Sequence, residues 1–162
     1  MSAIVLTNAS ITVGTVWGGG TAPGLPGTQT VAGTITSGSD LSVYCTSISI
    51  PLTMATQDAT NFGAGAFRVV LGGIKSSDIS LSLNNDFAAS ALNDILRTTL
   101  GGLGSTVYLD IKPTNAVRSG TNPSYVFAVL LSQIQPVTGS VGNINAMSLT
   151  WPSTGAFATL IA

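Results

Sequence analysis

Few side chains in this 162-residue sequence could carry out acid–base or metal chemistry. It contains no histidine, so it lacks the base of Ser-His-Asp and Cys-His arrangements and the commonest protein ligand of metal ions. Its six acidic residues are all aspartates, and their spacing matches no metal-binding loop. They are Asp40, Asp58, Asp78, Asp86, Asp94 and Asp110. Two carboxylates that meet only in space, as in glycoside hydrolysis, are the one catalytic arrangement left open.

The other candidate motifs also give little indication of a catalytic or phosphate-binding site. Cys45 has no histidine to activate its thiol, so we expect a small buried side chain in a strand. The segment GGIKS (72–76) faintly resembles a phosphate loop, but Ile74 separates its second glycine from the lysine, and we interpret the glycines as turn residues. The five basic residues are dispersed along the sequence, which argues against binding of nucleic-acid phosphates. We predict a protein that is not an enzyme and has no catalytic residue, cofactor or metal.

Charge is scarce along the whole chain. Charged residues make up 7% of it, against about a quarter in average globular proteins, and none lies between Thr121 and the last residue. A membrane-spanning helix needs about 20 apolar residues, and the longest strongly apolar run is 126–131. Interface cores are depleted of charge, so we predict that neighbouring copies cover much of the surface. An extracellular Ser/Thr/Gly-rich β-module is the alternative, although the first residues lack the features of a secretion signal.

Alternation of apolar and polar residues predicts a mainly β protein with a sandwich or barrel-like core. The run 126–131 is apolar on both faces, so we expect a central strand there. Further strands are expected at 4–6, 11–16 and 69–71. The alternating segments are Ile48-Ile50-Leu52-Met54, Ile79-Leu81-Leu83, Val107-Leu109-Ile111 and Met147-Leu149-Trp151.

One segment has helical spacing. From Asp86 to Leu100, apolar residues recur every four positions, which predicts one amphipathic helix of about four turns, capped by Asn85 or Asp86 and ended by Gly101-Gly102. Two stretches are expected to be surface loops within a single domain spanning 1–162. They are the Gly/Thr/Ser/Pro-rich stretch 18–40 and the long inter-strand loop 53–68, for which we favour contact with a neighbouring subunit.

The order of several short motifs resembles the major tail tube proteins of long-tailed, siphovirus-like bacteriophages. The resemblance covers about residues 40–157 and rests on the order of the motifs along the chain more than on any one motif. In chain order they are Asp40-Leu41-Ser42, Asp86-Phe87-Ala88-Ala89, GSTVYLDIKP (104–113), Asn122-Pro123-Ser124-Tyr125, Pro136-Val137, Gly139-Ser140-Val141-Gly142 and Pro152-Ser153-Thr154-Gly155. The stretch 18–40 departs from the family, where we associate a short turn with this position.

This resemblance implies a β-sandwich or barrel-like subunit with one flanking helix, assembled into stacked, typically hexameric rings. The tube would be part of the virion tail, made in the host cytoplasm. Its partners would be other copies of itself, the tape-measure protein and the tail-tip and tail-terminator proteins, and DNA would cross the lumen without sequence-specific binding. By the resemblance, residues 53–68 form the hairpin or loop that docks on the adjacent ring. The ring-stacking candidates are Met54, Asp58, Asn61, Phe62, Gly63, Gly65, Phe67 and Arg68.

The acidic balance and the alternating strand faces add a hypothesis about the lumen. Basic residues attracted to phosphate would hold DNA still, and we expect some of Asp58, Asp78 and Asp110 to face the lumen. Two other functions remain open: a capsid decoration or fibre-associated protein, and a non-catalytic carbohydrate-binding β-sandwich. The latter needs clustered aromatic residues, whereas Trp17 and Trp151 are far apart in the sequence and are expected to pack in the core or an interface.

Overall fold

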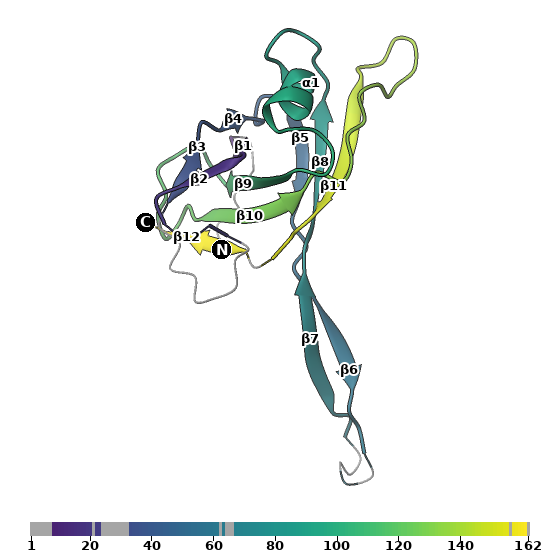
Figure 1. The fold of residues 1–162 in the computed structure, drawn as a ribbon. Helices are drawn as coiled ribbons and strands as arrows, with labels where there is room; N and C mark the ends of the chain where they lie inside the picture. Colours follow the sequence, from purple (N-terminus) through teal and green to yellow (C-terminus); the bar gives the residue numbers. More distant parts are fainter. Residues whose placement is uncertain are drawn as a thin grey trace.

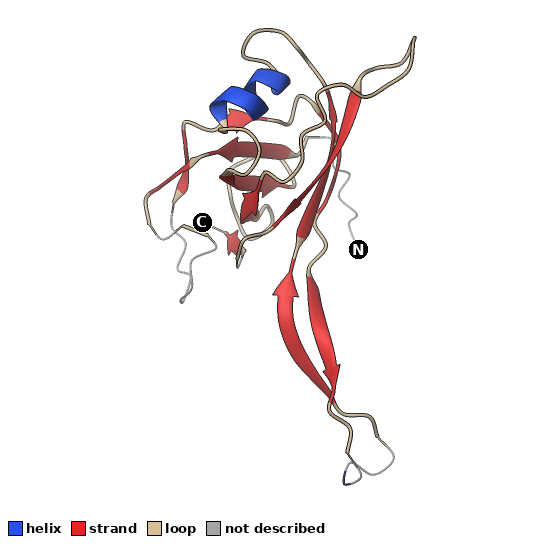
Figure 2. Cartoon of the chain, turned by 45° about the vertical axis from the view of Figure 1, so that its right-hand side comes forward, coloured by secondary structure: helices blue, strands red, loops and turns tan. Residues whose placement is uncertain are grey.

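The computed structural model describes residues 8–20, 22–23, 33–61, 63, 67–155 and 157–161. Within these ranges the chain is mainly β, as predicted, with antiparallel sheets and one short helical segment (Figures 1 and 2). The strands are β1 (Ser10–Gly14), β2 (Val16–Gly18), β3 (Thr34–Thr36), β4 (Ser39–Asp40), β5 (Cys45–Ser49), β6 (Thr53–Asp58), β7 (Val70–Ser76), β8 (Asp78–Asn84), β9 (Thr106–Lys112), β10 (Ser124–Leu130), β11 (Ala146–Pro152) and β12 (Ala158–Leu160). The helical turns are α1 (Leu92–Asp94) and the π-helix η2 (Ile95–Thr99).

Two sheets enclose the core. The larger has the strand order β12-β10-β9-β1-β4, and the smaller has the order β11-β8-β5. Their strands run in clearly different directions (Figure 1). Two ribbons, β2-β3 and β6-β7, complete the strand arrangement of the described residues. The predicted strand at 4–6 lies outside these residues.

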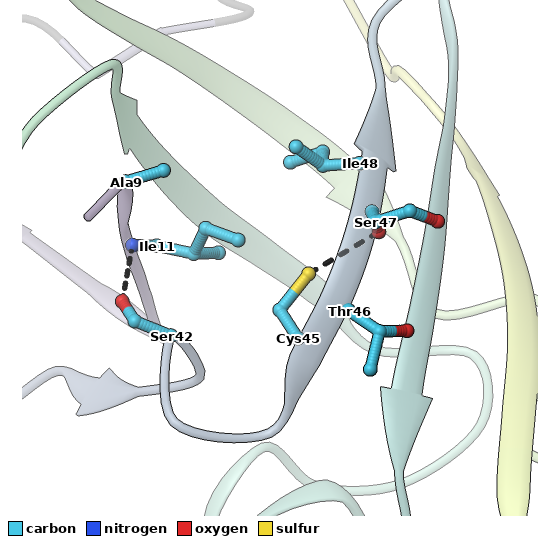
Figure 3. A pocket seen from close by; sticks show the side chains of 7 residues that line it. All are labelled: Ala9, Ile11, Ser42, Cys45, Thr46, Ser47 and Ile48. Carbon is cyan, nitrogen blue, oxygen red and sulfur yellow. Dashed lines mark hydrogen bonds between the residues drawn. The ribbon is translucent and has the colours of Figure 1, made fainter. Parts of the chain in front are cut away.

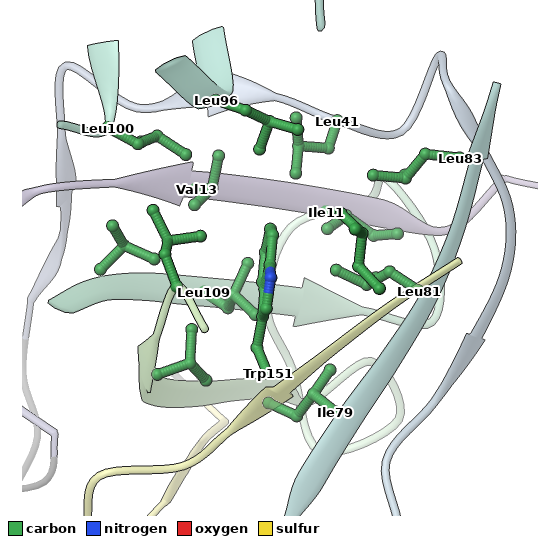
Figure 4. Packing of buried hydrophobic residues seen from close by; sticks show 14 of the residues in the cluster. Ile11, Val13, Leu41, Ile79, Leu81, Leu83, Leu96, Leu100, Leu109 and Trp151 are labelled. Carbon is green, nitrogen blue, oxygen red and sulfur yellow. The ribbon is translucent and has the colours of Figure 1, made fainter. Parts of the chain in front are cut away.

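Alternating side chains from both sheets fill the space between them, as the period-2 pattern predicts. Ile79, Leu81 and Leu83 of β8 are at most 1% exposed, and the apolar residues of β9 and β11 are similarly buried. Trp151 of β11 lies among them, within a cluster that also includes Ile11, Val13 and Leu109 (Figure 4). Its indole Nε1 donates a hydrogen bond to the Gln133 carbonyl at 2.9 Å, so the polar atom of this buried ring is satisfied.

Strand β10 is covered on both faces, as its continuous apolar run predicts. Val126, Phe127, Ala128 and Val129 are all buried, and β10 pairs with β9 on one side and β12 on the other. Phe157 stacks on Phe127 with ring centroids 5.5 Å apart. This strand therefore belongs to the body of the molecule.

The predicted helix at 86–100 is shorter than expected and begins later. Helical turns cover only Leu92–Asp94 and Ile95–Thr99. Ser90 has φ +62°, a left-handed conformation that interrupts a helix, and Asp86 Oδ1 accepts the Ala88 N–H in a local turn instead of capping a helix. Leu92, Ile95 and Leu96 are buried, whereas Phe87 at the start of the predicted stripe is exposed. Gly101 and Gly102 end the segment with positive φ, as predicted.

Residues 53–68, which we predicted to be a loop, begin with a strand. Strand β6 pairs with β7, and the two form a long hairpin that projects from the body (Figures 1 and 2). Ser49 pairs with Ser80, and four residues along each strand Thr53 pairs with Ser76, so the hairpin continues the register of β5 and β8. Because the strand leaves the body, Leu52 and Met54 are exposed rather than buried as the alternation predicted.

The glycines of GGIKS are also in a different place from the one we predicted. Gly72 and Gly73 lie within strand β7 rather than in a turn, opposite an irregularity in β6 between Met54 and Thr56. A Cβ on Gly72 would stand 3.0 Å from the Met54 side chain, and one on Gly73 would stand 3.1 Å from the Ala55 carbonyl oxygen. Glycine here permits the close approach of the two strands at a bulge.

The stretch 18–40 is not entirely a loop. Its described residues include β3, which pairs with β2 through Trp17 opposite Ile35, and β4, which pairs with β1. Trp17 packs on Tyr108 of β9 with ring centroids 5.8 Å apart, so the β2-β3 ribbon lies against the larger sheet. Residues 24–32 of this stretch lie outside the described part of the chain.

Candidate assembly surfaces

Every residue of β6 and β7 is exposed. Several large apolar side chains stand on this hairpin or beside it, and the exposed fractions of Phe67 and Ile74 are both 83%. We call this set the hairpin surface, and it consists of Leu52, Met54, Phe67, Val69, Val70, Leu71 and Ile74. Apolar groups exposed together on this scale mark an interaction site more often than ordinary solvated surface.

Six of the eight ring-stacking candidates lie in the described residues, and all six lie on this projection. Met54 and Asp58 are in β6, Asn61 and Gly63 are at the tip, and Phe67 and Arg68 lead into β7. Phe62 and Gly65 lie outside the described residues. The sequence prediction missed five residues of the hairpin surface: Leu52, Val69, Val70, Leu71 and Ile74.

Polar contacts fix the chain near the tip of the hairpin. Asp58 accepts hydrogen bonds from the Thr60 hydroxyl at 2.6 Å, the Thr60 N–H at 2.9 Å and Arg68 Nε at 3.0 Å. These donors, with the Thr60 hydroxyl first, hold the pKa of Asp58 below its usual range. The ionised carboxylate therefore supports the tip at neutral pH, and this support is lost as the pH falls through the lowered pKa.

The outward side of the smaller sheet carries a regular array of hydroxyl groups. Ser82 of β8 pairs with Ser47 of β5 on one side and Ser148 of β11 on the other. Ser80 pairs in the same way with Ser49 and Thr150, so two rows of hydroxyls cross the sheet. We call this set the hydroxyl face, and it consists of Ser47, Ser49, Ser80, Ser82, Ser148 and Thr150. Asp78, a lumenal candidate, is exposed and follows the same side of β8 at the end nearest the hairpin.

The third lumenal candidate, Asp110, lies in a different setting from the exposed one we expected. Asp110 is only 7% exposed, and its Oδ2 accepts a hydrogen bond from Arg118 Nη2 at 2.6 Å. The buried hydroxyl of Ser124 donates to Oδ1, and Arg118 also donates to the Gly33 carbonyl at 2.9 Å. The charge of Asp110 is thus paired inside the molecule, where it holds the turn at 113–123 against the larger sheet.

A pocket of about 310 Å³ lies between β1 and β5 and contains Cys45 (Figure 3). The Cys45 thiol donates to the Ser47 carbonyl at 3.2 Å, and Ser42 Oγ accepts the Ile11 N–H at 2.7 Å. Burial raises the pKa of the thiol. The Cys45 thiol and the Ser42 hydroxyl are therefore engaged in structural bonds, and no base or acid is among the residues that line the pocket.

A metal site and a membrane-spanning helix are both absent from the described residues. No group of three or more His, Cys, Asp or Glu side chains there could hold a metal ion. No helix in the same ranges is long and apolar enough to cross a membrane. Trp151 is fully buried and cannot form part of an aromatic platform for a sugar, whereas the neighbouring rings of Trp17 and Tyr108 are half-buried.

Comparison with known proteins finds a similar structure but no family that matches the sequence. No family model and no curated protein matches the sequence. A chain from a solved structure titled "Virion of native gene transfer agent (GTA) particle" matches with a TM-score of 0.55 and 19% identity, over 75% of this chain and 88% of that chain. At this identity the likeness is one of fold.

Proposed function

We propose that this protein is a structural component of a virion and, more specifically, a tail tube subunit that assembles into stacked, hexameric rings. The β6-β7 hairpin is the observation that carries the proposal. A two-stranded ribbon alone is at best marginally stable in water, and this one exposes the whole hairpin surface. Docking on a neighbouring copy would remove these apolar groups from water and support the ribbon.

The likeness of fold supports the same proposal. The matched chain belongs to a structure titled as a virion particle, and this chain covers most of its length. A structural, non-catalytic role in a virion agrees with a pocket lined by no acid or base and with a chain that carries little charge. The partners in such a tail would be the tape-measure, tail-tip and tail-terminator proteins.

The hydroxyl face is the surface that we assign to the lumen. Neutral hydroxyls offer DNA no fixed positive charge, and a passing polyanion therefore releases few counterions and is not retained. Asp78 at the edge of this face would add weak repulsion, whereas the charge of Asp58 on the hairpin is paired with Arg68. Because its charge is paired with Arg118 inside the subunit, Asp110 is not part of this lumenal set.

A capsid decoration or fibre-associated role would use the hairpin differently. Such a protein would attach its hairpin to a different protein and would not polymerise by itself. A carbohydrate-binding role is less well supported, because the fully buried Trp151 cannot contribute to a binding platform. The shape of the assembly therefore distinguishes a tail tube subunit, which forms rings or tubes by itself, from these two alternatives.

Purified protein across a concentration series is expected to form rings or hollow tubes of uniform diameter. Negative-stain electron microscopy and sedimentation velocity on the same samples would measure this. If subunits stay monomeric, the cognate tail-tip complex would be added as an initiator. A protein that remains monomeric with the initiator present would contradict the tail tube proposal.

A cysteine on the hydroxyl face is expected to become inaccessible to large reagents when tubes form. In a Cys45→Ala background, Ser148→Cys would be treated with a small maleimide or with a maleimide coupled to a globular protein. Unassembled subunits, the matched control, should react with both. Assembled tubes should react fully with the small reagent and only at background level with the large one. Equal labelling of tubes by both would place this face outside the lumen.

A further inference from the structure

The subunit has a second apolar surface at the end opposite the hairpin. Strand β8 begins at Asp78 beside the hairpin and ends at Asn84, so its two ends are separated by about 20 Å. At the Asn84 end, the exposed apolar side chains come from three chain segments. We call this set the far-end surface, and it consists of Val43, Phe87, Val137, Val141 and Ile144.

Hydrogen bonds hold these segments together at that end. The Asn84 N–H donates to the Tyr44 carbonyl at 2.8 Å, and the Asn85 N–H donates to the Asn145 carbonyl at 2.7 Å. The Asn85 side chain donates to the Pro136 carbonyl, and Asn145 Oδ1 accepts the Thr138 N–H at 3.0 Å. The segments 42–44, 85–87 and 136–145 are therefore neighbours at the end of the smaller sheet, and both views show this end pointing away from the hairpin (Figures 1 and 2).

The two surfaces are complementary in character. Both expose large apolar groups, and together they leave few charges to desolvate. Residues 52–76 carry two basic groups, Arg68 and Lys75, and one acidic group, Asp58. The three far-end segments carry a single charge, the exposed Asp86. The hairpin is thus net positive and the far end net negative, which favours contact between them over contact between two like ends.

We propose that the far-end surface receives the hairpin surface of a second copy of this chain. This inference rests on the proposed function and adds the receiving partner of the hairpin. Because the donating and receiving surfaces are different and lie at opposite ends, the contact is head-to-tail. It does not close on itself along this direction, so each copy added leaves a new hairpin or a new far end exposed, and the assembly extends.

Chemical crosslinking between two different single-cysteine variants tests the contact. In a Cys45→Ala background, Ile74→Cys would be mixed with Val141→Cys under assembling conditions and treated with a short bismaleimide. The expected product is a crosslinked dimer at several times the yield given by either variant alone. The matched control replaces Val141→Cys with Val117→Cys, which is also highly exposed but lies in the 113–123 turn, and should give only the yield of the single variants.

The outcomes separate the two proposals. Tubes seen by electron microscopy without a crosslink above the control would overturn the far-end assignment and leave the tail tube proposal standing. A crosslink with Val117→Cys as strong as with Val141→Cys would also overturn the assignment. Absence of both tubes and crosslinks, with the initiator present, would reject both proposals.

Discussion

Replacement of Thr53–Ser76 by an Asn-Gly turn is expected to give a folded subunit that forms no tubes. The replaced residues of β6 and β7 are all exposed, and none belongs to the core between the two sheets, so that core loses no contact. Strands β5 and β8 already run antiparallel, and Asn-Gly is the turn that best joins such strands through two residues. The variant lacks every residue of the hairpin surface except Leu52, so its assembly should fall below detection.

Two measurements check this expectation on the same sample. Thermal unfolding should occur within a few degrees of the unmodified subunit, because the surface residues removed contribute little to stability. Electron microscopy should show no tubes at concentrations where the unmodified protein forms them. Tubes of ordinary length from the truncated variant would show that the hairpin does not stack the rings.

A single substitution provides a finer version of the experiment. Ile74→Asp places a charge at a residue that is 83% exposed in the subunit, and it should weaken assembly strongly because docking would bury that charge. Val117→Asp introduces the same charge at an exposed position outside the hairpin and should assemble normally. Equal loss in both variants would indicate a general effect of charge rather than a hairpin contact.

Trp151→Ala is expected to destabilise the subunit by about 3–5 kcal/mol, the usual range for removal of a large aromatic side chain from a core. The indole is fully buried between the two sheets, where Ile79, Leu81 and Leu109 surround it (Figure 4). Its removal leaves a cavity that side chains from two sheets cannot close at once. It also leaves the Gln133 carbonyl without its donor.

Urea unfolding of unassembled protein measures this loss, because assembly would otherwise add to the apparent stability. Trp17→Ala serves as the matched control: Trp17 is only half-buried, and its loss should cost clearly less. Trp151→Phe fills most of the space and should fall between the two. A loss of under about 1 kcal/mol for Trp151→Ala would contradict the packing described for the core.

Local patterns predicted the body of the fold well. The alternation in Ile79-Leu81-Leu83 and Met147-Leu149-Trp151 identified two strands of the smaller sheet and the faces that they bury. The helix was overestimated because apolar spacing alone does not show that Ser90 adopts a left-handed conformation or that Asp86 closes a local turn. Those outcomes depend on how the chain leaves β8, which is a tertiary constraint.

The candidate surfaces were only partly predictable. Alternation is the same for a strand inside the body and one that projects from it, so nothing local showed that Met54 and Leu71 would be exposed. The alternation correctly placed Asp110 on the other face of its strand from Leu109 and Ile111. It could not show that Arg118, from the 113–123 turn, would pair with Asp110. The far-end surface unites segments some 40 to 90 residues apart in sequence, which only the fold brings together.

The bulge opposite Gly72 and Gly73 has a mechanical consequence. Up to Met54 the hairpin continues the ladder of the smaller sheet, so this part would move with the body as one stiff beam. Beyond it the register shifts by one residue, and the ladder loses its regular hydrogen bonding at that point. In a stacked tube, each hairpin that connects one ring to the next would bend most easily at this bulge. A tail could then bend between rings while the hydroxyl wall within each ring keeps its shape.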